Sequence, residues 1–156
     1  MRIEKPLLTA ITSVVLLACS QTSMGADTGR PVPPSASRQV CHTQDCTVEV
    51  SPQADCVFLA KPEVLDLGGN PGLPHRKITW TITNTNFEFS TSAGTPALDP
   101  KGASGFFGKP HVNPKKKQEL FTIVNVNSPA SKHEYGLNIV KTNGPPCKEY
   151  DPFVIE

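Results

Sequence analysis

Cysteine is the residue type in this chain with the widest choice of chemistry, because its sulfur can form a disulfide or, as a thiolate, bind a metal. Four cysteines lie beyond residue 40: Cys41, Cys46, Cys56 and Cys147. In an oxidising compartment this even number predicts two disulfides, for which three pairings exist. The spacing alone does not choose among them. We favour Cys41 with Cys46 and Cys56 with Cys147, because the second bond would close a loop of about 90 residues and stabilise the fold by about 4–5 kcal/mol.

Zinc binding is the alternative use of the first two cysteines. Cys41, His42 and Cys46 supply the thiolate and imidazole groups that zinc prefers. Structural zinc sites, however, usually combine two closely spaced cysteine pairs, and no second pair follows in this sequence. We therefore favour a disulfide over a zinc site at this position.

Copper would need a different set of ligands, because a blue-copper centre contains two histidines, a cysteine thiolate and usually a methionine. His133 and Cys147 are close in sequence, but the only methionines are Met1 and Met24. A disulfide at Cys147 would also remove the thiolate. We predict no bound metal and no other cofactor.

No arrangement of side chains in the sequence predicts a hydrolase. Ser104 lies in Gly102-Ala103-Ser104-Gly105, which lacks the Gly-x-Ser-x-Gly spacing of a nucleophile elbow. Three histidines lie beside turn residues, where solvated positions are more common than general bases: His75, His111 and His133. Two aspartates precede prolines, as turn residues often do: Asp99 and Asp151. We predict no catalytic residue, and a small envelope hydrolase or a copper- or zinc-binding protein is the alternative to a non-enzymatic role.

Lys115, Lys116 and Lys117 form the one local concentration of charge in the sequence. They could contact an anionic lipid headgroup, a lipopolysaccharide or the carboxylates of peptidoglycan, and Phe106 and Phe107 could add apolar contact. We predict that these five residues bind an envelope protein or glycan. The alternative is structural: the lysines protect a strand edge, and one phenylalanine belongs to the core.

The amino-terminal residues have the pattern of an export signal. Arg2 and Lys5 precede an uncharged run at 7–18. This run has the length of a signal-peptide core and is too short to cross a hydrocarbon layer of about 30 Å. It leads into Leu16-Leu17-Ala18-Cys19-Ser20, which closely resembles the lipobox of bacterial lipoproteins.

The lipobox resemblance implies a modified Cys19. It implies a diacylglycerol thioether on the sulfur, cleavage before this residue, and acylation of the new amino terminus by a fatty acid such as palmitate. Ser20, in place of aspartate, resembles the outer-membrane sorting pattern of enteric bacteria. We therefore expect a protein of the cell envelope that Cys19 anchors to the outer membrane. The alternative is an ordinary secretory signal, cleaved after Ala18 or Ala26.

Composition divides the remaining chain into a tether and one domain. Residues 19–40 contain few large apolar side chains and are predicted to form a flexible tether, on the order of 25 Å long. Residues 41–156 are enough for one domain with a core. The 16 prolines and 11 glycines favour strands and loops over helices. Without residues 1–18 the chain keeps 13 of its 15 basic and 13 of its 14 acidic residues, so we predict no nucleic-acid partner.

Short apolar runs with a period of two predict the strands of the domain. The clearest is Lys77–Thr83, in which Ile78, Trp80 and Ile82 alternate with threonines. The other predicted strands are Thr47–Val50, Cys56–Leu59, Val64–Leu67, Phe87–Phe89, Leu120–Val126, Tyr135–Val140 and Asp151–Glu156. A long loop is predicted at 91–118. About seven or eight short strands at this spacing predict an all-β fold, an antiparallel β-sandwich.

A second resemblance covers residues 56–156. The Ile-x-Trp-x-Ile strand, the following Phe-x-Phe, the later Tyr-x-Leu-x-Ile and the terminal Asp-Pro-x-Val-Ile are similar to small exported Gram-negative proteins. Those proteins have an immunoglobulin-like or cupredoxin-like sandwich. The motifs are mostly core positions, so the resemblance implies a fold and no activity. We expect a signal peptide at 1–18, a tether at 19–40 and a disulfide-stabilised sandwich at 41–156, with a non-enzymatic binding or structural role.

Overall fold

The computed structural model of the chain describes residues 31, 33–68, 72–103, 105–126 and 131–155. Within these ranges every regular element is a strand, which confirms the all-β prediction. The strands are β1 (Arg38–Val40), β2 (Asp45–Ala54), β3 (Val57–Lys61), β4 (Val64–Asp66), β5 (His75–Ile82), β6 (Phe87–Phe89), β7 (Thr91–Ser92), β8 (Thr95–Pro96), β9 (Leu98–Asp99), β10 (His111–Asn113), β11 (Lys116–Asn125), β12 (Lys132–Glu134), β13 (Gly136–Leu137), β14 (Ile139–Lys141) and β15 (Phe153–Ile155). The same ranges contain no helix that could span a membrane. The predicted signal peptide and Cys19 lie outside the described residues.

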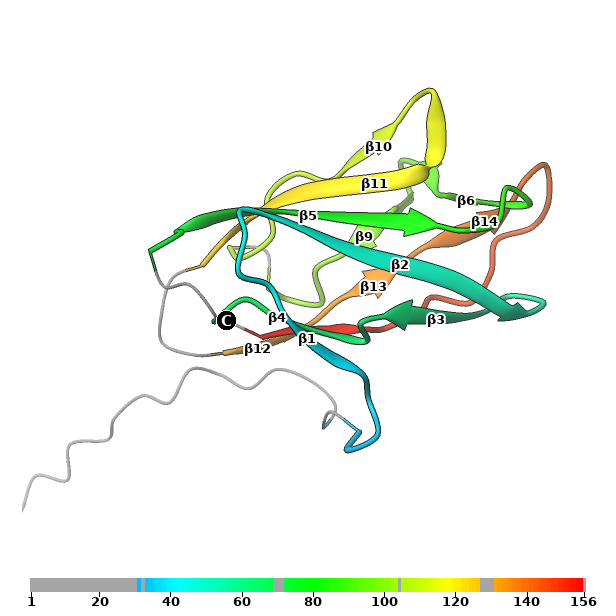
Figure 1. The fold of residues 1–156 in the computed structure, drawn as a ribbon. Helices are drawn as coiled ribbons and strands as arrows, with labels where there is room; N and C mark the ends of the chain where they lie inside the picture. Colours follow the sequence, from blue (N-terminus) through cyan, green and yellow to red (C-terminus); the bar gives the residue numbers. More distant parts are fainter. Residues whose placement is uncertain (1–30, 32, 69–71, 104, 127–130, 156) are drawn as a thin grey trace, which may run out of the picture.

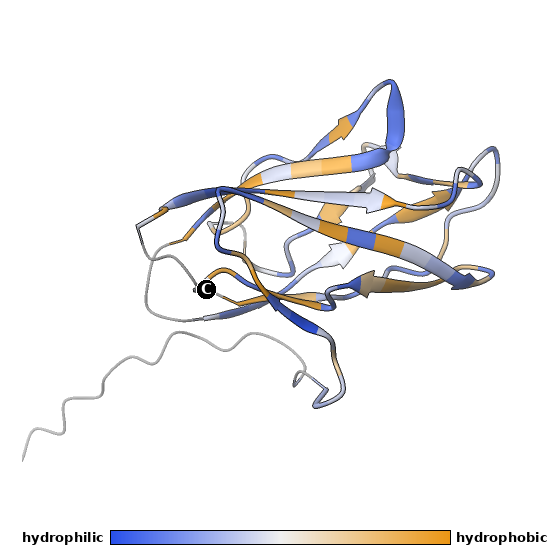
Figure 2. Cartoon of the chain, in the orientation of Figure 1, coloured by the Kyte–Doolittle hydropathy of each residue, from blue (hydrophilic) through white to orange (hydrophobic). Residues whose placement is uncertain are grey.

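Apolar side chains occupy the buried alternate positions along most of β5 and β2, and the exception in β5 is Arg76, which is charged and fully buried. In β5, Ile78, Trp80 and Ile82 are buried, and the threonines between them are half-buried on the other face. In β2, Val48 and Val50 are fully buried in the same way. Figure 2 shows this alternation along β2. A period of two places one face of each strand in the core, and this fixes which side of the sheet is covered.

The five-stranded sheet has the order β10-β11-β5-β2-β3 (Figure 1). β11 runs antiparallel to β5 and β3 runs antiparallel to β2, but β2 and β5 are parallel, with Val48 opposite Trp80. The prediction of an entirely antiparallel fold is therefore wrong. The chain leaves this sheet after β3, passes through β4 in another sheet, and returns beside β2 in the same direction. A parallel neighbour needs such a crossover.

The four-stranded sheet has the order β1-β4-β15-β12, so strands from both ends of the described chain meet in it. β1 and β15 flank β4 and both run parallel to it. β1 lies within the range predicted as a tether, and Arg38 in it forms an ion pair with Asp66 at 2.5 Å. The tether prediction is thus wrong for its last residues. All three residues of β1 are exposed, so no apolar alternation marks this strand in the sequence.

Buried aromatic side chains join the five-stranded sheet to the shorter sheets. Trp80 Nε1 donates a hydrogen bond to Tyr135 Oη at 2.8 Å, and the two ring centroids are 5.4 Å apart. Phe58 of β3 and Phe87 of β6 pack edge to face with centroids 5.2 Å apart. Tyr135 lies between β12 and β13, and Phe58 and Phe87 belong to different sheets, so the core lies between the five-stranded sheet and the shorter sheets.

The structure contains both favoured disulfides. Cys41 pairs with Cys46 and Cys56 pairs with Cys147, which confirms the predicted pairing. The first bond closes a short loop before β2. The second joins the β2–β3 turn to the segment that leads into β15, across a sequence separation of 91 residues.

Two predicted segments differ from the structure. Residues 91–118 are not one loop, because they contain β7, β8, β9, β10 and the start of β11. The first three of these strands have two residues each, which is too short for an alternation to be visible. The predicted strand Tyr135–Val140 is divided into β13 and β14. The break is at Asn138, whose N–H donates to the Ala97 carbonyl and whose carbonyl accepts from Ser90 N–H, both at 2.9 Å.

Candidate lysine-rich binding surface

The lysine hairpin consists of β10, β11 and the two residues between them. It carries Lys115, Lys116 and Lys117, and all three side chains are exposed. Asn113 holds the turn: its Oδ1 accepts a hydrogen bond from Lys115 N–H at 3.0 Å, and its Nδ2 donates to Glu119 at 2.8 Å. An asparagine in this position satisfies the backbone of a tight turn. The turn therefore presents the three lysines to solvent.

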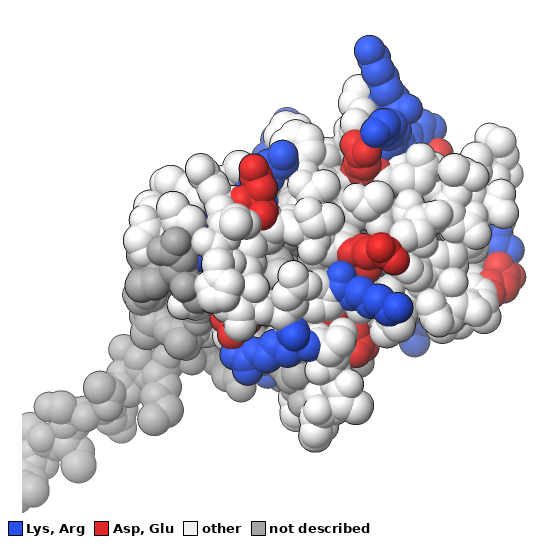
Figure 3. All heavy atoms as spheres, viewed as in Figure 1, with Lys and Arg blue, Asp and Glu red and all other residues white. Residues whose placement is uncertain are grey.

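Two of these lysines have an acidic neighbour. Lys116 Nζ is 3.0 Å from Glu119 Oε1, and Lys117 Nζ is 3.3 Å from Glu88 Oε1. The pKa of Glu119 is lowered, first by its hydrogen bond with Lys116 and then by that with Asn113. The Lys115 ammonium group makes no ion pair with a described residue. The hairpin thus keeps an excess of positive charge, and blue side chains gather over it at the upper right of Figure 3.

A pocket of about 350 Å³ lies between β10 and the β7–β8 hairpin. We call it the hydroxyl pocket, and it is lined by Ser90, Thr91, Ser92, Pro96, Ala97, Lys109, Pro110 and Val112. Ser90 is buried, and its hydroxyl donates to the Thr95 carbonyl at 2.6 Å, which fixes the shape of the β7–β8 hairpin. Lys109 is exposed, and its ammonium group has no partner in the described part of the chain.

The lysine hairpin and the hydroxyl pocket belong to one surface. Gln118 Nε2 donates to the Phe87 carbonyl at 3.0 Å, so the base of the hairpin packs on β6. Glu88 in β6 pairs with Lys117 and is only two residues from Ser90 in the pocket wall. β10 is the outer strand of its sheet and supplies Val112 to the pocket.

Phe106 and Phe107 do not take part in this surface. Their exposed fractions are 6% and 5%, so the prediction that they bind a partner is wrong. Residues 105–108 lie along the far end of β11: Asn125 N–H donates to the Phe106 carbonyl at 2.9 Å, and Phe107 bridges Val124. This pairing turns both rings into the core. The structural alternative placed only one phenylalanine in the core, but both are there.

The three histidines considered for hydrolysis are not brought together. His75 Nδ1 is 2.9 Å from Asn125 Oδ1, and His111 stacks on Phe121 with centroids 5.2 Å apart. His133 stacks on Phe106 with centroids 4.0 Å apart. These three rings lie on different strands, β5, β10 and β12. Ser104 lies outside the described residues.

The two aspartates are part of an ion-pair network that the sequence does not reveal. Lys101 Nζ lies 3.8 Å from Asp99 and 3.5 Å from Asp151, and it also pairs with Glu149. The pKa of Lys101 is raised, chiefly by the hydrogen bond with Glu149. Asp99 Oδ1 accepts from Lys101 N–H at 3.0 Å, as a turn residue does. The network brings together residues about 50 positions apart, so no local pattern could have shown it.

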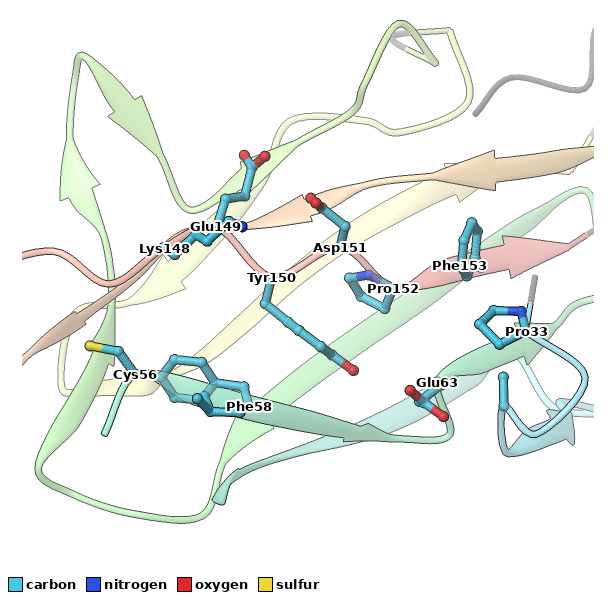
Figure 4. Close-up of a pocket in the computed structure, with 12 residues that line it drawn as sticks. Pro33, Cys56, Phe58, Glu63, Lys148, Glu149, Tyr150, Asp151, Pro152 and Phe153 are labelled. Atoms are coloured by element: carbon cyan, nitrogen blue, oxygen red, sulfur yellow. The ribbon is translucent and has the colours of Figure 1, made fainter. Parts of the chain in front are cut away.

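A second pocket, of about 380 Å³, lies between β3 and the segment before β15 (Figure 4). Tyr150 points into it, and its hydroxyl accepts a hydrogen bond from Ala60 N–H at 2.8 Å. Glu63 at its edge accepts from Ser37 N–H at 3.3 Å. Glu149 pairs with Lys101. Because these polar groups already serve the fold, this pocket has a weaker claim to a ligand than the lysine-rich surface.

The described residues do not fit a zinc or copper centre. Both disulfides consume the thiols that such a site would use, at Cys41, Cys46 and Cys147. Within the described ranges, no group of three or more histidine, cysteine or acidic side chains is arranged to hold a metal ion. Met1 and Met24 lie outside those ranges.

Comparison with known proteins does not connect this surface to a characterised activity. No protein-family model matches the chain, and no curated protein is significantly similar to it. The lysine hairpin and the hydroxyl pocket are therefore interpreted from their own chemistry.

Proposed function

We propose that the chain is a lipid-anchored, non-enzymatic protein of the bacterial cell envelope, located at the outer membrane. Cys19 would carry the lipid, and the lysine hairpin would bind an anionic envelope component, protein or glycan. The support for the anchor is the lipobox resemblance in the sequence. The support for the binding role is the excess of exposed positive charge on the hairpin.

The position of the hairpin carries this proposal. Figure 1 shows the β10–β11 turn at the top of the domain and residues 33–37, where the described chain enters it, at the bottom. A domain tethered through its amino terminus would therefore present the lysines away from the anchor. Exposed cations in that position suit a partner that lies beyond the membrane surface, and they would speed its encounter through long-range attraction.

We also infer that the sheets form a β-sandwich of the immunoglobulin-like or cupredoxin-like kind. The contacts of Trp80 with Tyr135 and of Phe58 with Phe87 support it, because they join facing sheets. Such a fold is compatible with many functions, so the proposed binding role rests on the exposed lysines.

The test compares binding to isolated peptidoglycan sacculi and crosslinking to envelope proteins. In the tested variant Lys115, Lys116 and Lys117 are changed to glutamine. We expect capture of one anionic class of partner by the unchanged chain. Capture should be roughly tenfold or more weaker in the variant, because each exposed charge pair contributes about 0.5–1 kcal/mol.

The matched control removes the same charge elsewhere, with Lys61, Lys77 and Lys141 changed to glutamine. This control variant should bind like the unchanged chain. Binding of the unchanged chain should weaken as the salt concentration is raised, because salt screens exposed charges. Equal capture by both triple variants, or no capture by the unchanged chain, would reject the proposed role.

A further inference from the structure

Two lysines that have no acidic partner among the described residues, Lys109 and Lys115, flank the same edge strand. Lys109 lies two residues before β10 and Lys115 lies two residues after it. In extended chain this separation corresponds to up to about 20 Å. β10 is the outer strand of the five-stranded sheet, so no further strand of that sheet pairs with its outer side. A ligand that meets both must therefore be elongated.

The hydroxyl pocket lies along this same edge and has a mixed lining. Pro96, Pro110 and Val112 supply apolar surface, and Thr91 and Ser92 supply exposed hydroxyl groups. A sugar ring has the same mixture, with apolar C–H groups on its faces and hydroxyls on its rim. Small-ligand sites typically combine apolar walls with a few polar groups in this way, and a volume of about 350 Å³ falls in their usual range.

We propose that the edge along β10 binds a linear acidic polysaccharide. One sugar ring occupies the hydroxyl pocket, and anionic substituents of the chain meet Lys109 and Lys115. This inference rests on the proposed function and names the partner class for the same surface. Lys109 lines the pocket and Lys115 lies past the other end of β10, so a linear polymer that follows this strand would meet both cations.

Other anionic partners use this surface less completely. A flat anionic bilayer would meet the exposed tip at Lys115 to Lys117 and leave the hydroxyl pocket, which is walled by the β7–β8 hairpin, unused. An acidic polypeptide could pair with the lysines, but it would not need the hydroxyl and proline lining. The polysaccharide accounts for both parts of the surface.

The experiment is titration calorimetry of the purified full chain with a six-unit uronic-acid oligosaccharide. The comparison ligands are its methyl-esterified, uncharged form, its two-unit fragment, poly-glutamate, and vesicles of phosphatidylglycerol. We expect the six-unit acid to bind at least tenfold more tightly than the esterified form or the short fragment, because only a long, charged chain reaches both cations.

Three substitutions in the proposed site and one control locate the binding. Lys109→Gln and Lys115→Gln should each weaken binding of the six-unit acid about fivefold, and Lys61→Gln on the distant β3 should leave it unchanged. Val112→Asp should also weaken it, by placing a carboxylate in the pocket. A circular dichroism spectrum and melting curve like those of the unchanged chain would show that each variant is folded.

The outcomes separate this inference from the proposed function. Equal binding of poly-glutamate or of vesicles, or no effect of Lys109→Gln, would overturn the polysaccharide assignment while leaving an anion-binding hairpin. If Lys115→Gln also left binding unchanged, both the polysaccharide assignment and the proposed anion-binding role of the hairpin would be overturned.

Discussion

At the residue scale, a single hydrogen bond in the core connects β5 to Tyr135, which lies between β12 and β13. Trp80 is fully buried in β5, and its indole N–H has Tyr135 Oη as its acceptor. Burial raises the pKa of Tyr135, so its hydroxyl stays protonated across the physiological range. The sequence shows Trp80 as a core residue through its alternation with threonines. It does not show Tyr135 as its partner, because the two residues are 55 positions apart.

Tyr135→Phe should lower the free energy of unfolding by about 1–3 kcal/mol, because the buried Trp80 N–H loses its acceptor. Urea unfolding followed by tryptophan fluorescence would measure it. Tyr150→Phe is the control, since it removes a hydroxyl that accepts from Ala60 N–H at a partly buried site. We expect a smaller loss for the control, of about 0.5–1.5 kcal/mol. Unchanged stability of the Tyr135 variant would contradict the role assigned to this bond.

At the element scale, the two disulfides close loops of very different length. Cys41–Cys46 closes a sequence separation of 5 residues, and Cys56–Cys147 one of 91. Cys56 has a left-handed backbone, with φ of 57°, at the end of the β2–β3 turn. This turn brings it to the segment before β15. The loop-length argument predicted the pairing, but the turn that makes it possible begins later than the sequence pattern indicated.

Removing the long-range disulfide should destabilise the fold more than removing the short one. With Cys56 and Cys147 changed to alanine we expect a loss of about 4–5 kcal/mol, against about 2 kcal/mol for the Cys41 and Cys46 pair, because the longer loop restricts the unfolded chain more. Urea unfolding of the two double variants gives the comparison. Equal losses, or a greater loss for the short loop, would show that strain or residual structure outweighs loop entropy.

The proposed lipid anchor belongs to the scale of the whole molecule, because it would place the domain and its lysine hairpin relative to a membrane. The chain is hydrogen-bonded to the domain from Ser37 onward, because Val64 N–H donates to the Ser37 carbonyl at 2.9 Å. This contact beside β1 and β4 shortens the segment that could act as a tether. Fewer residues are then left for the predicted tether than the 19–40 expected from composition.

Cys19→Ser should move the protein from the membrane fraction to the soluble fraction of the envelope, because no acyl chain can then be attached at this position. Fractionation with immunodetection tests this, and intact mass of the unchanged protein should include the acyl groups. Cys41→Ser is the control and should stay with the membrane. Recovery of the Cys19 variant in the membrane would contradict a lipid anchor at this residue.

The sequence by itself determined the all-β character, the central strand around Trp80 and the expectation of two disulfides. These depend on local alternation or on the number of cysteines, which are properties of the linear chain. Only the tertiary structure decided that β2 and β5 run parallel, that Phe106 and Phe107 are buried, and that Lys109 lines a pocket beside the lysine hairpin. Each of these depends on which distant strands become neighbours, and long-range packing, not local sequence, selects those neighbours.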